Sequence, residues 1–219
     1  MLDIIYSILK RNSPCRALQK IEARKFELYG NSLEFGNVKF NNKSFFNDFK
    51  LNKKNKIFFS DIIKIKRKNY FMFDLEKKNN LKKKFDNIII FNVLEHIYET
   101  DNAFTELKKL LKPKGKIYIS TPFLYRYHSA PKDYYRFTLD FYEKIAKKQK
   151  IKIIYKKSLG TGPFFSSYSV MHNILNFVFP LNILTAIILI SFDKIISIFS
   201  KNLKYTYPIC NFVVFRKDS

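Results

Sequence analysis

Two polar segments of the chain carry side chains that can position an acceptor and remove a proton from it. The first contains Glu95 and His96, directly after an apolar run. The second contains His128, the best candidate general base, because an imidazole exchanges a proton near neutral pH. Asp133 follows as a base or as the group that orients His128. The same segment offers side chains suited to binding a sugar or a phosphorylated glycan: Tyr127, Tyr134, Tyr135 and Arg136.

Several of these residues also have a purely structural interpretation. Glu95 suits a capping or hydrogen-bonding role that shapes its own loop, and His96 can either support the site or face the acceptor. Asp133 and Arg136 are three residues apart, so they can pair with each other and fix the loop. His172 stands alone in an apolar segment, which favours a packed histidine over a ligand.

The elements that position these side chains follow from the hydrophobic pattern. An apolar run without alternation at 88–91 predicts a strand covered on both faces. The polar loop after it then lies beyond the carboxyl end of the strand, where open parallel sheets bind ligands. Further strands are expected at 32–35, 56–60, 69–73, 116–121, 151–155 and 211–215, and helices at 101–111 and 138–148. This order predicts an α/β fold.

The central stretch, from Phe85 to Thr138, also carries a family resemblance. It contains FDNIIIFNVLEHI and LKKLLKPKGKIYISTP, which resemble the second half of a class I S-adenosylmethionine-dependent methyltransferase, with Lys114 where the family usually has glycine. The following HSAPKDYYRFT resembles a subgroup associated with surface-polysaccharide biosynthesis. The resemblance implies a Rossmann-like, seven-stranded, mostly parallel sheet with helices on both faces and a last, antiparallel strand.

The resemblance implies S-adenosylmethionine as the cofactor and a glycine-containing turn after the first strand. Glu34 and Gly36 match the family pattern of an acidic residue followed by glycine. The second glycine of that pattern is missing, and Asn37, Val38 and Lys39 occupy the rest of the turn. Asn37 can partly replace the glycine, because asparagine tolerates left-handed backbone.

Other cofactor contacts are implied at the ends of the next strands. Asp61 would accept hydrogen bonds from the ribose hydroxyls, which suits a carboxylate. Asp74 and Leu75 would flank the adenine, and Asn92 and Val93 would lie near the methionine end. Each Asp also has the simpler interpretation of a turn or helix cap at a strand end.

Together these features predict methyl transfer from S-adenosylmethionine, with an oxygen of a glycan or glycolipid precursor as the acceptor. The acceptor class rests on the subgroup resemblance alone. The sulfonium methyl group is already activated, so no metal is required and none is expected. One alternative is a catalytically weak or inactive scaffold in glycan assembly. A second alternative is a nicotinamide-dependent enzyme, but that class would need a fuller glycine turn than this chain has. A third is a nucleic-acid binder, which would be supported if the protein still bound DNA or RNA at raised salt.

Composition narrows the class of protein. The 219 residues carry a net charge of +23, but the lysines are spread along the chain, which is typical of a solvated surface. We therefore expect no nucleic-acid partner, although attraction to anionic lipid stays open. The two cysteines, Cys15 and Cys210, form no metal-binding cluster. The opening MLDIIYSILKR lacks the features of a secretory signal, so a cytoplasmic location is expected.

The chain divides into three expected parts. Residues 1–30 would form helices that either cap the cofactor or pack on the sheet. Residues 31–157 and 207–219 would form the methyltransferase core, and 158–206 a hydrophobic helical insertion. The 35 residues from Ser158 to Phe192 contain no Asp, Glu, Lys or Arg. A helical hairpin here would make peripheral membrane contact through 160–200, or would serve as a hydrophobic lid or dimer surface.

Overall fold

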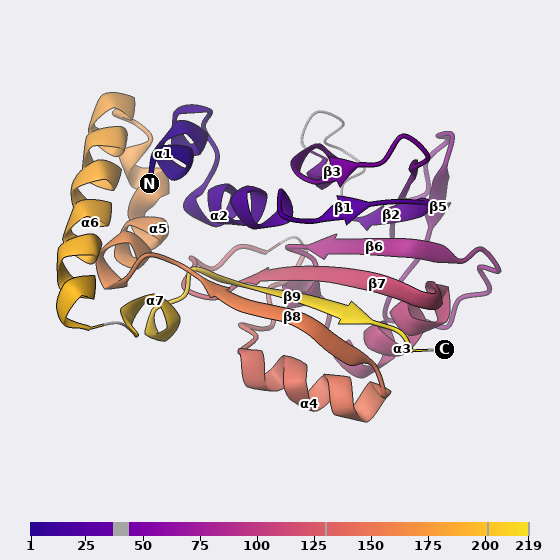
Figure 1. Cartoon of the computed structure of the whole chain (residues 1–219). Helices are drawn as coiled ribbons and strands as arrows, with labels where there is room; N and C mark the ends of the chain where they lie inside the picture. Colours follow the sequence, from indigo (N-terminus) through magenta and orange to yellow (C-terminus); the bar gives the residue numbers. More distant parts are fainter. Residues whose placement is uncertain (37–43, 130, 201, 219) are drawn as a thin grey trace.

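The structure is a computed structural model that describes residues 1–36, 44–129, 131–200 and 202–218. Seven strands form one sheet in the order β5-β4-β2-β6-β7-β9-β8 (Figure 1). Their bounds are β2 Asn31–Phe35, β4 Lys56–Asp61, β5 Tyr70–Met72, β6 Phe85–Phe91, β7 Leu111–Pro122, β8 Lys152–Leu159 and β9 Cys210–Arg216. All neighbours are parallel except the two pairs that β9 makes, so the predicted antiparallel last strand is confirmed.

Helices cover both faces of the sheet, which confirms the predicted fold class. On one face lie α3 (Thr100–Leu110) and α4 (Leu139–Gln149), and on the other α1 (Leu2–Leu9) and α2 (Pro14–Ala23) with the short helix η2 (Phe45–Asp48). Each face encloses its own hydrophobic core. Because β6 is packed on both sides, Ile88, Ile89 and Ile90 are fully buried, as the uninterrupted apolar run predicts.

Local sequence signals set the helix ends. The Ser13 side chain accepts a hydrogen bond from Arg16 N, and Pro14 occupies the first turn of α2. Thr138 caps α4 in the same way, at the position where the sequence predicts that this helix begins. A small parallel pair was not expected: β1 (Glu27–Leu28) lies beside β3 (Lys50–Leu51).

A hydrophobic helical hairpin lies between β8 and β9 in the chain. It comprises α5 (Pro163–Leu175) and α6 (Phe179–Phe199), followed by the short α7 (Leu203–Thr206). The buried Asp193 joins the two long helices, because its carboxylate accepts hydrogen bonds from Phe164 N and Phe165 N at 3.0 Å each and from the Thr161 hydroxyl at 2.6 Å. These bonds satisfy free N–H groups at the start of α5.

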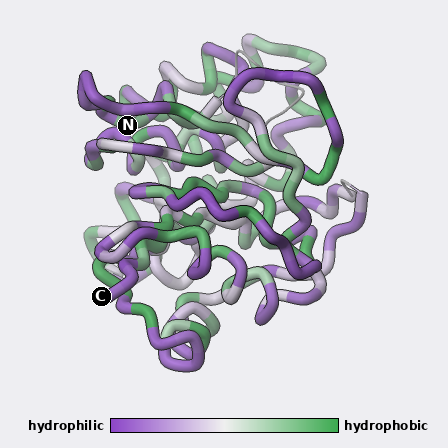
Figure 2. The backbone as a smooth tube through the Cα atoms, turned by 90° about the vertical axis from the view of Figure 1, so that its right-hand side faces the viewer, coloured by the Kyte–Doolittle hydropathy of each residue, from purple (hydrophilic) through white to green (hydrophobic). Residues whose placement is uncertain are grey.

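The helix α6 is long and apolar enough to cross a membrane, judged by length and composition. It has 21 residues and a mean hydropathy of 1.9, and 22% of its most apolar window is buried. The helices α5 and α6 stand at the end of the sheet toward which β6 and β7 point (Figure 1). The opposite end of the molecule presents largely hydrophilic loops, with hydrophobic segments between them (Figure 2).

Candidate functional site

A cavity of about 510 Å³ opens at the carboxyl ends of the parallel strands. This is the place at which open parallel α/β sheets bind ligands. The segments after β2, β4, β5, β6 and β7 all contribute to its wall, and the start of α2 closes one side. Its lining residues include Ser13, Cys15, Gly36, Asp61, Asp74, Leu75, Asn92, Val93, His96, Tyr125 and His128.

The turn after β2 depends on glycine. Gly36 has a φ of +79°, and a Cβ built there would lie 2.5 Å from Val93 Cγ2. Gly36 N donates to Ser60 O at 3.0 Å, which ties the turn to β4. The turn and the loop after β6 therefore touch at the cavity wall. The remaining turn residues predicted to matter, Asn37, Val38 and Lys39, lie outside the residues that the structure describes.

Glu34, predicted to contact the cofactor, is not among the residues that line the cavity. Its side chain is fully buried and accepts hydrogen bonds from Ser44 Oγ at 2.5 Å and from Phe45 N at 3.0 Å. The carboxylate therefore anchors the start of η2 to β2. Glu34 thus holds the segment beside the glycine turn, and its contact with the cofactor stays a prediction.

The other predicted cofactor residues do line the cavity. Asp61 ends β4, and its Oδ1 accepts from Ile62 N at 2.7 Å. Asp74 accepts from Glu76 N at 3.0 Å and Leu75 is almost fully buried, so this segment forms a fixed wall. The turn hydrogen bonds match the simpler interpretation of both Asp residues, and the cofactor contacts stay a prediction. The two carboxylates give this end of the cavity its acceptor groups.

Asn92 and the first helices are joined by a buried network that the sequence did not indicate. Asn92 has a φ of +54°, and Gln19 Nε2 donates to its Oδ1 at 2.6 Å. Asn92 Nδ2 donates back to Gln19 Oε1 at 3.1 Å, and Gln19 also donates to Ser120 Oγ at 3.1 Å. This network holds α2 against the sheet, so residues 1–30 pack on the sheet. Ser13 and Cys15 of the same segment also line the cavity.

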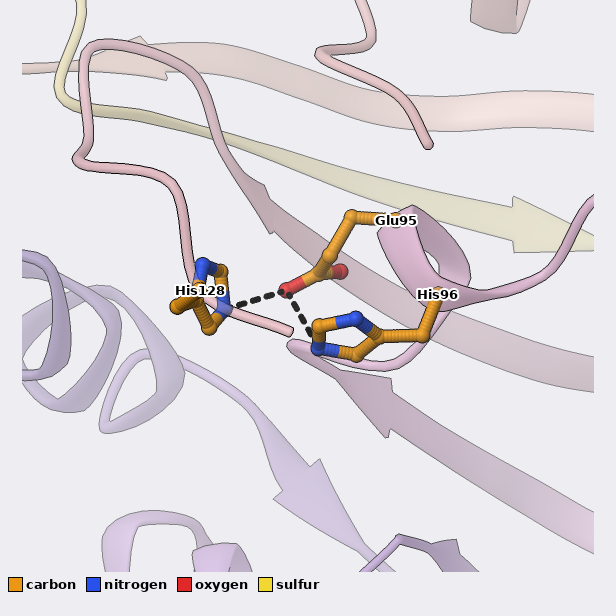
Figure 3. A group of neighbouring side chains, drawn as sticks. All are labelled: Glu95, His96 and His128. Carbon is orange, nitrogen blue, oxygen red and sulfur yellow. Dashed lines mark ion pairs between the residues drawn. The ribbon is translucent and has the colours of Figure 1, made fainter. Parts of the chain in front are cut away.

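Three side chains converge at the other end of the cavity. Glu95 and His96 belong to the short helix η3 (Leu94–His96), and His128 comes from the loop after β7 (Figure 3). Glu95 Oε1 lies 3.9 Å from His96 Nε2 and 3.8 Å from His128 Nε2. The two imidazole rings have centroids 5.0 Å apart. The two predicted segments thus meet around Glu95.

The buried carboxyl group of Glu95 has no hydrogen-bond partner among the described residues. Burial raises the pKa of Glu95 to about 8. The predicted hydrogen-bonding role of this side chain stays a prediction, and the backbone oxygen of Glu95 accepts from Tyr134 N at 2.8 Å. Burial also lowers the pKa of His128, although Asp133 opposes that shift.

Asp133 and Arg136 form the structural pair that the sequence left open. Arg136 donates to the two carboxylate oxygens at 2.5 and 2.7 Å, and also to Tyr135 O and Arg126 O. The Arg136 hydrogen bonds hold the pKa of Asp133 at about 2. This pair matches the loop-fixing interpretation of Arg136, and its substrate contact stays a prediction. Asp133 Oδ2 accepts from His128 N at 2.9 Å and lies 3.2 Å from His128 Nδ1, so it is placed to orient that ring rather than to act as a base.

The predicted sugar-binding tyrosines lie outside the cavity lining. Tyr127 and Tyr134 are exposed, and Tyr135 donates through its hydroxyl to Tyr98 O at 3.3 Å. Tyr98 and Tyr134 make an edge-to-face contact with ring centroids 5.4 Å apart, which forms an aromatic patch outside the cavity. Within the cavity the aromatic group beside His128 is Tyr125, at a ring distance of 5.2 Å.

Comparison with known proteins identifies the family. Residues 13–159 match the family profile described as "methyltransferase domain". No curated protein matches the sequence. Among solved structures, a phosphoethanolamine N-methyltransferase of Haemonchus contortus, in complex with phosphomonomethylethanolamine and S-adenosylhomocysteine, is similar at a TM-score of 0.56 and 17% identity; the alignment covers 92% of this chain and 52% of that enzyme.

A cyclopropane synthase of Mycobacterium tuberculosis is similar at a TM-score of 0.54 and 11% identity, over 90% of this chain and 81% of that one. The chain thus spans about half the length of the nematode enzyme. Both solved structures share the fold of this chain, and the residues matched by the family profile include most of the sheet and the cavity. The chain therefore belongs to the methyltransferase domain family.

Proposed function

We propose that this enzyme transfers the methyl group of S-adenosylmethionine to a hydroxyl oxygen of a glycan or glycolipid precursor. One observation carries the proposal. A single cavity joins Asp61 and Asp74, at the ends of β4 and β5, to His96 and His128. Carboxylates suit the hydroxyl and amine groups of an adenosine, and imidazoles suit the acceptor end, where a proton must leave.

The cofactor would lie along the carboxyl ends of the strands. Asp61 would accept hydrogen bonds from the ribose hydroxyls, and Asp74 with Leu75 would border the adenine. Gly36 and Val93 would border the methionine portion, because the left-handed turn at Gly36 lets the backbone approach closely. Residues 1–30 would then close the site as a cap on the 31–157 and 207–219 core, through Ser13 and Cys15.

The reaction itself requires positioning and one proton transfer. The acceptor oxygen attacks the methyl carbon, the bond from carbon to the sulfonium sulfur breaks, and neutral S-adenosylhomocysteine leaves. His128 Nε2 is the group that we place beside the acceptor to take its proton. Asp133 would hold the ring in orientation, as the 3.2 Å separation from His128 Nδ1 supports.

Two features support a glycan or glycolipid acceptor. The exposed patch of Tyr98 and Tyr134 offers ring faces of the kind that stack on sugars, at the edge of the loop that carries His128. The loop sequence HSAPKDYYRFT resembles the subgroup associated with surface polysaccharides. Neither feature selects the atom that is methylated, so that atom must come from product analysis.

We also propose that the insertion, residues 158–206, rests on an anionic membrane surface. Phe177 is 92% exposed and Phe199 86%, and Ile174 and Ile198 are also largely exposed. Side chains of this kind bury readily at a lipid interface, and the net charge of +23 favours anionic lipid. Such contact would bring lipid-linked acceptors toward the site. Flotation with phosphatidylglycerol vesicles tests this contact. Recovery of all the protein in the vesicle-free fraction at low salt would contradict it.

The function is tested by supplying acceptors directly. The enzyme would be incubated with S-adenosylmethionine and a panel of lipid-linked and free oligosaccharides, and S-adenosylhomocysteine would be measured by mass spectrometry. We expect stoichiometric formation of a methyl ether on one acceptor class. Formation of a methylamine product, or turnover only with acceptors that lack sugar, would overturn the acceptor assignment while leaving methyl transfer intact.

A further inference from the structure

We propose that Glu95, His96 and His128 bind a divalent transition-metal cation at the acceptor end of the cavity. The binding itself stands on the geometry of these three side chains, and its role in the reaction rests on the proposed function. One ligand atom from each side chain lies within 4.8 Å of the other two. Two imidazoles and one carboxylate with an open side form a ligand set that is typical of catalytic metal sites.

The separations are close to those of an occupied site. Ligand atoms at about 2.1 Å from a shared ion in tetrahedral geometry lie about 3.4 Å apart. Glu95 Oε1 lies 3.8 Å from His128 Nε2 and 3.9 Å from His96 Nε2. The ligand atoms of the third pair, His96 and His128, lie within 4.8 Å of each other, so rotations that draw the three side chains together would bring their ligand atoms into the range of a bound ion. Figure 3 shows the three groups facing one another.

The tautomer of each histidine is set by the hydrogen bonds on the side of the ring that faces away from Glu95. These bonds determine which ring nitrogen is unprotonated. His96 Nδ1 lies 2.5 Å from Lys132 O, a group that only accepts, so this nitrogen carries the hydrogen. His128 Nδ1 faces the Asp133 carboxylate at 3.2 Å and Arg126 O at 3.4 Å, and both of these groups also only accept. Each neutral ring therefore turns an unprotonated Nε2 toward Glu95. Metal-binding histidines are oriented by the same kind of outer partner.

Glu95 supplies the second, independent observation. Its side chain is fully buried, and neither carboxyl oxygen has a hydrogen-bond partner among the described residues. Buried polar groups are almost always paired, because an unpaired one costs free energy. Here a carboxyl group and two imidazole lone pairs converge, and no donor among the described side chains lies between them. A cation at their centre would satisfy all three.

The charges around the cluster do not oppose a cation. Arg126, Lys132 and Arg136 are the positive residues nearest to His128 in the chain, and the Asp133 carboxylate neutralises Arg136 in a two-point pair. Two imidazoles favour Zn²⁺, Fe²⁺ or Co²⁺ over Mg²⁺ and Ca²⁺, which prefer oxygen ligands, and the carboxylate of Glu95 lets Mn²⁺ bind as well. Because His96 and His128 line the cavity, the open side of the ion faces the space where the acceptor would lie.

A bound cation would change how the acceptor loses its proton. The acceptor hydroxyl would coordinate the ion, which lowers the pKa of that hydroxyl, and its proton would pass to solvent. The resulting alkoxide oxygen would form its bond to the methyl carbon as the carbon–sulfur bond breaks. His128 would then act as a ligand, and the ion would replace it as the group that activates the acceptor.

The test counts bound metal in the full chain without an affinity tag. Chelator-treated protein is titrated with Mn²⁺, and free Mn²⁺ is followed by electron paramagnetic resonance, since Mn²⁺ has little affinity for thiolates. We expect one bound Mn²⁺ per chain, with affinity at least about tenfold weaker in Glu95→Gln and His96→Gln. His172→Gln removes a buried histidine whose Nδ1 lies 3.0 Å from Ser169 O, outside the cavity lining, and should bind as the parent does.

A second measurement needs no variant and covers the case in which one fails to fold. The chain has 3 histidines, and diamagnetic Zn²⁺ should shift the imidazole NMR signals of His96 and His128 and leave those of His172 unchanged. Equal affinity in the parent and both cluster variants, Zn²⁺-induced shifts confined to His172, or no saturable binding by folded protein would overturn the proposal. Calorimetric binding of S-adenosylmethionine in the same samples separates the two claims, because metal binding without cofactor binding would contradict only the proposed function.

Discussion

Gly36 and Val93 approach so closely that a Cβ on residue 36 would come within 2.5 Å of Val93 Cγ2. Gly36→Ala should therefore weaken S-adenosylmethionine binding and lower the free energy of unfolding by at least about 1–2 kcal/mol, the cost of left-handed backbone at alanine. The measurements are calorimetric titration and denaturant unfolding. Val93→Ala in the Gly36→Ala background should recover part of the stability, because it removes the contact and leaves the backbone strain. No recovery would show that backbone strain alone accounts for the loss.

Gln19 connects α2 to the cavity floor, and removing its amide should affect both stability and binding. In Gln19→Ala, the side chain of the left-handed residue Asn92 loses both hydrogen bonds to Gln19, and its Oδ1 keeps only the long contact from Cys15 Sγ at 4.0 Å. Each buried polar group left unpaired costs about 1–3 kcal/mol. We expect a lower midpoint of urea unfolding and weaker cofactor binding. Gln149→Ala, at a partly exposed site on α4, is the matched control and should cost less; an equal cost would contradict the account.

Glu22 should make the stability of the fold depend on pH. Burial opposes ionisation of its carboxyl, but hydrogen bonds from Lys25, Tyr155 and Lys157 outweigh it and lower the pKa. A carboxyl group whose pKa is lower in the folded state stabilises the fold above its unfolded pKa, about 4.3, and loses that contribution as the pH falls further.

The comparison of the parent protein with Glu22→Gln isolates this contribution. The difference in unfolding free energy between them should be largest near neutral pH and should shrink as the pH falls below about 4.3. Denaturant unfolding at a series of pH values measures it. A difference that stays constant down to acid denaturation would show that the contacts of Glu22 with Lys25 and Lys157 do not favour its ionised form.

His128→Ala should abolish turnover and leave cofactor binding in place. The ring lines the cavity beside Glu95, at the end away from the carboxylates of Asp61 and Asp74. Single-turnover methyl transfer and calorimetry would be measured on the same preparation, with His172→Ala as the control histidine outside the cavity. Turnover at the parent rate would remove His128 from any role at the acceptor, whether as a base or as a metal ligand.

The fold could be predicted from the sequence because its signals are local. The buried strand β6 has an uninterrupted apolar run, and Thr138 and Pro14 mark helix starts. The seven-stranded, mostly parallel sheet and the antiparallel β9 followed from the family resemblance, and both are confirmed. Boundaries moved by a few residues, as in β7, which begins at Leu111.

The site was only partly predictable because it depends on side-chain partners that are distant in the chain. Residues with one strong local signal, such as Asp61 and His128, do line the cavity. Glu34 and Arg136 are not among the lining residues, and Ser44 and Asp133 hydrogen-bond to their charged groups. The bond between Gln19 and Asn92 joins segments that no sequence pattern relates.

The most direct test of the account is calorimetric titration of the folded protein with S-adenosylmethionine and S-adenosylhomocysteine. The account predicts saturable binding of both ligands at one site per chain. In Asp61→Asn the affinity should fall about tenfold to a hundredfold, since hydrogen bonds to a charged group contribute about 1.5–3 kcal/mol. Asp101→Asn, on the exposed start of α3, should bind as the parent does. Failure of the folded parent chain to bind either ligand would contradict the central claim and would favour a scaffold role in glycan assembly.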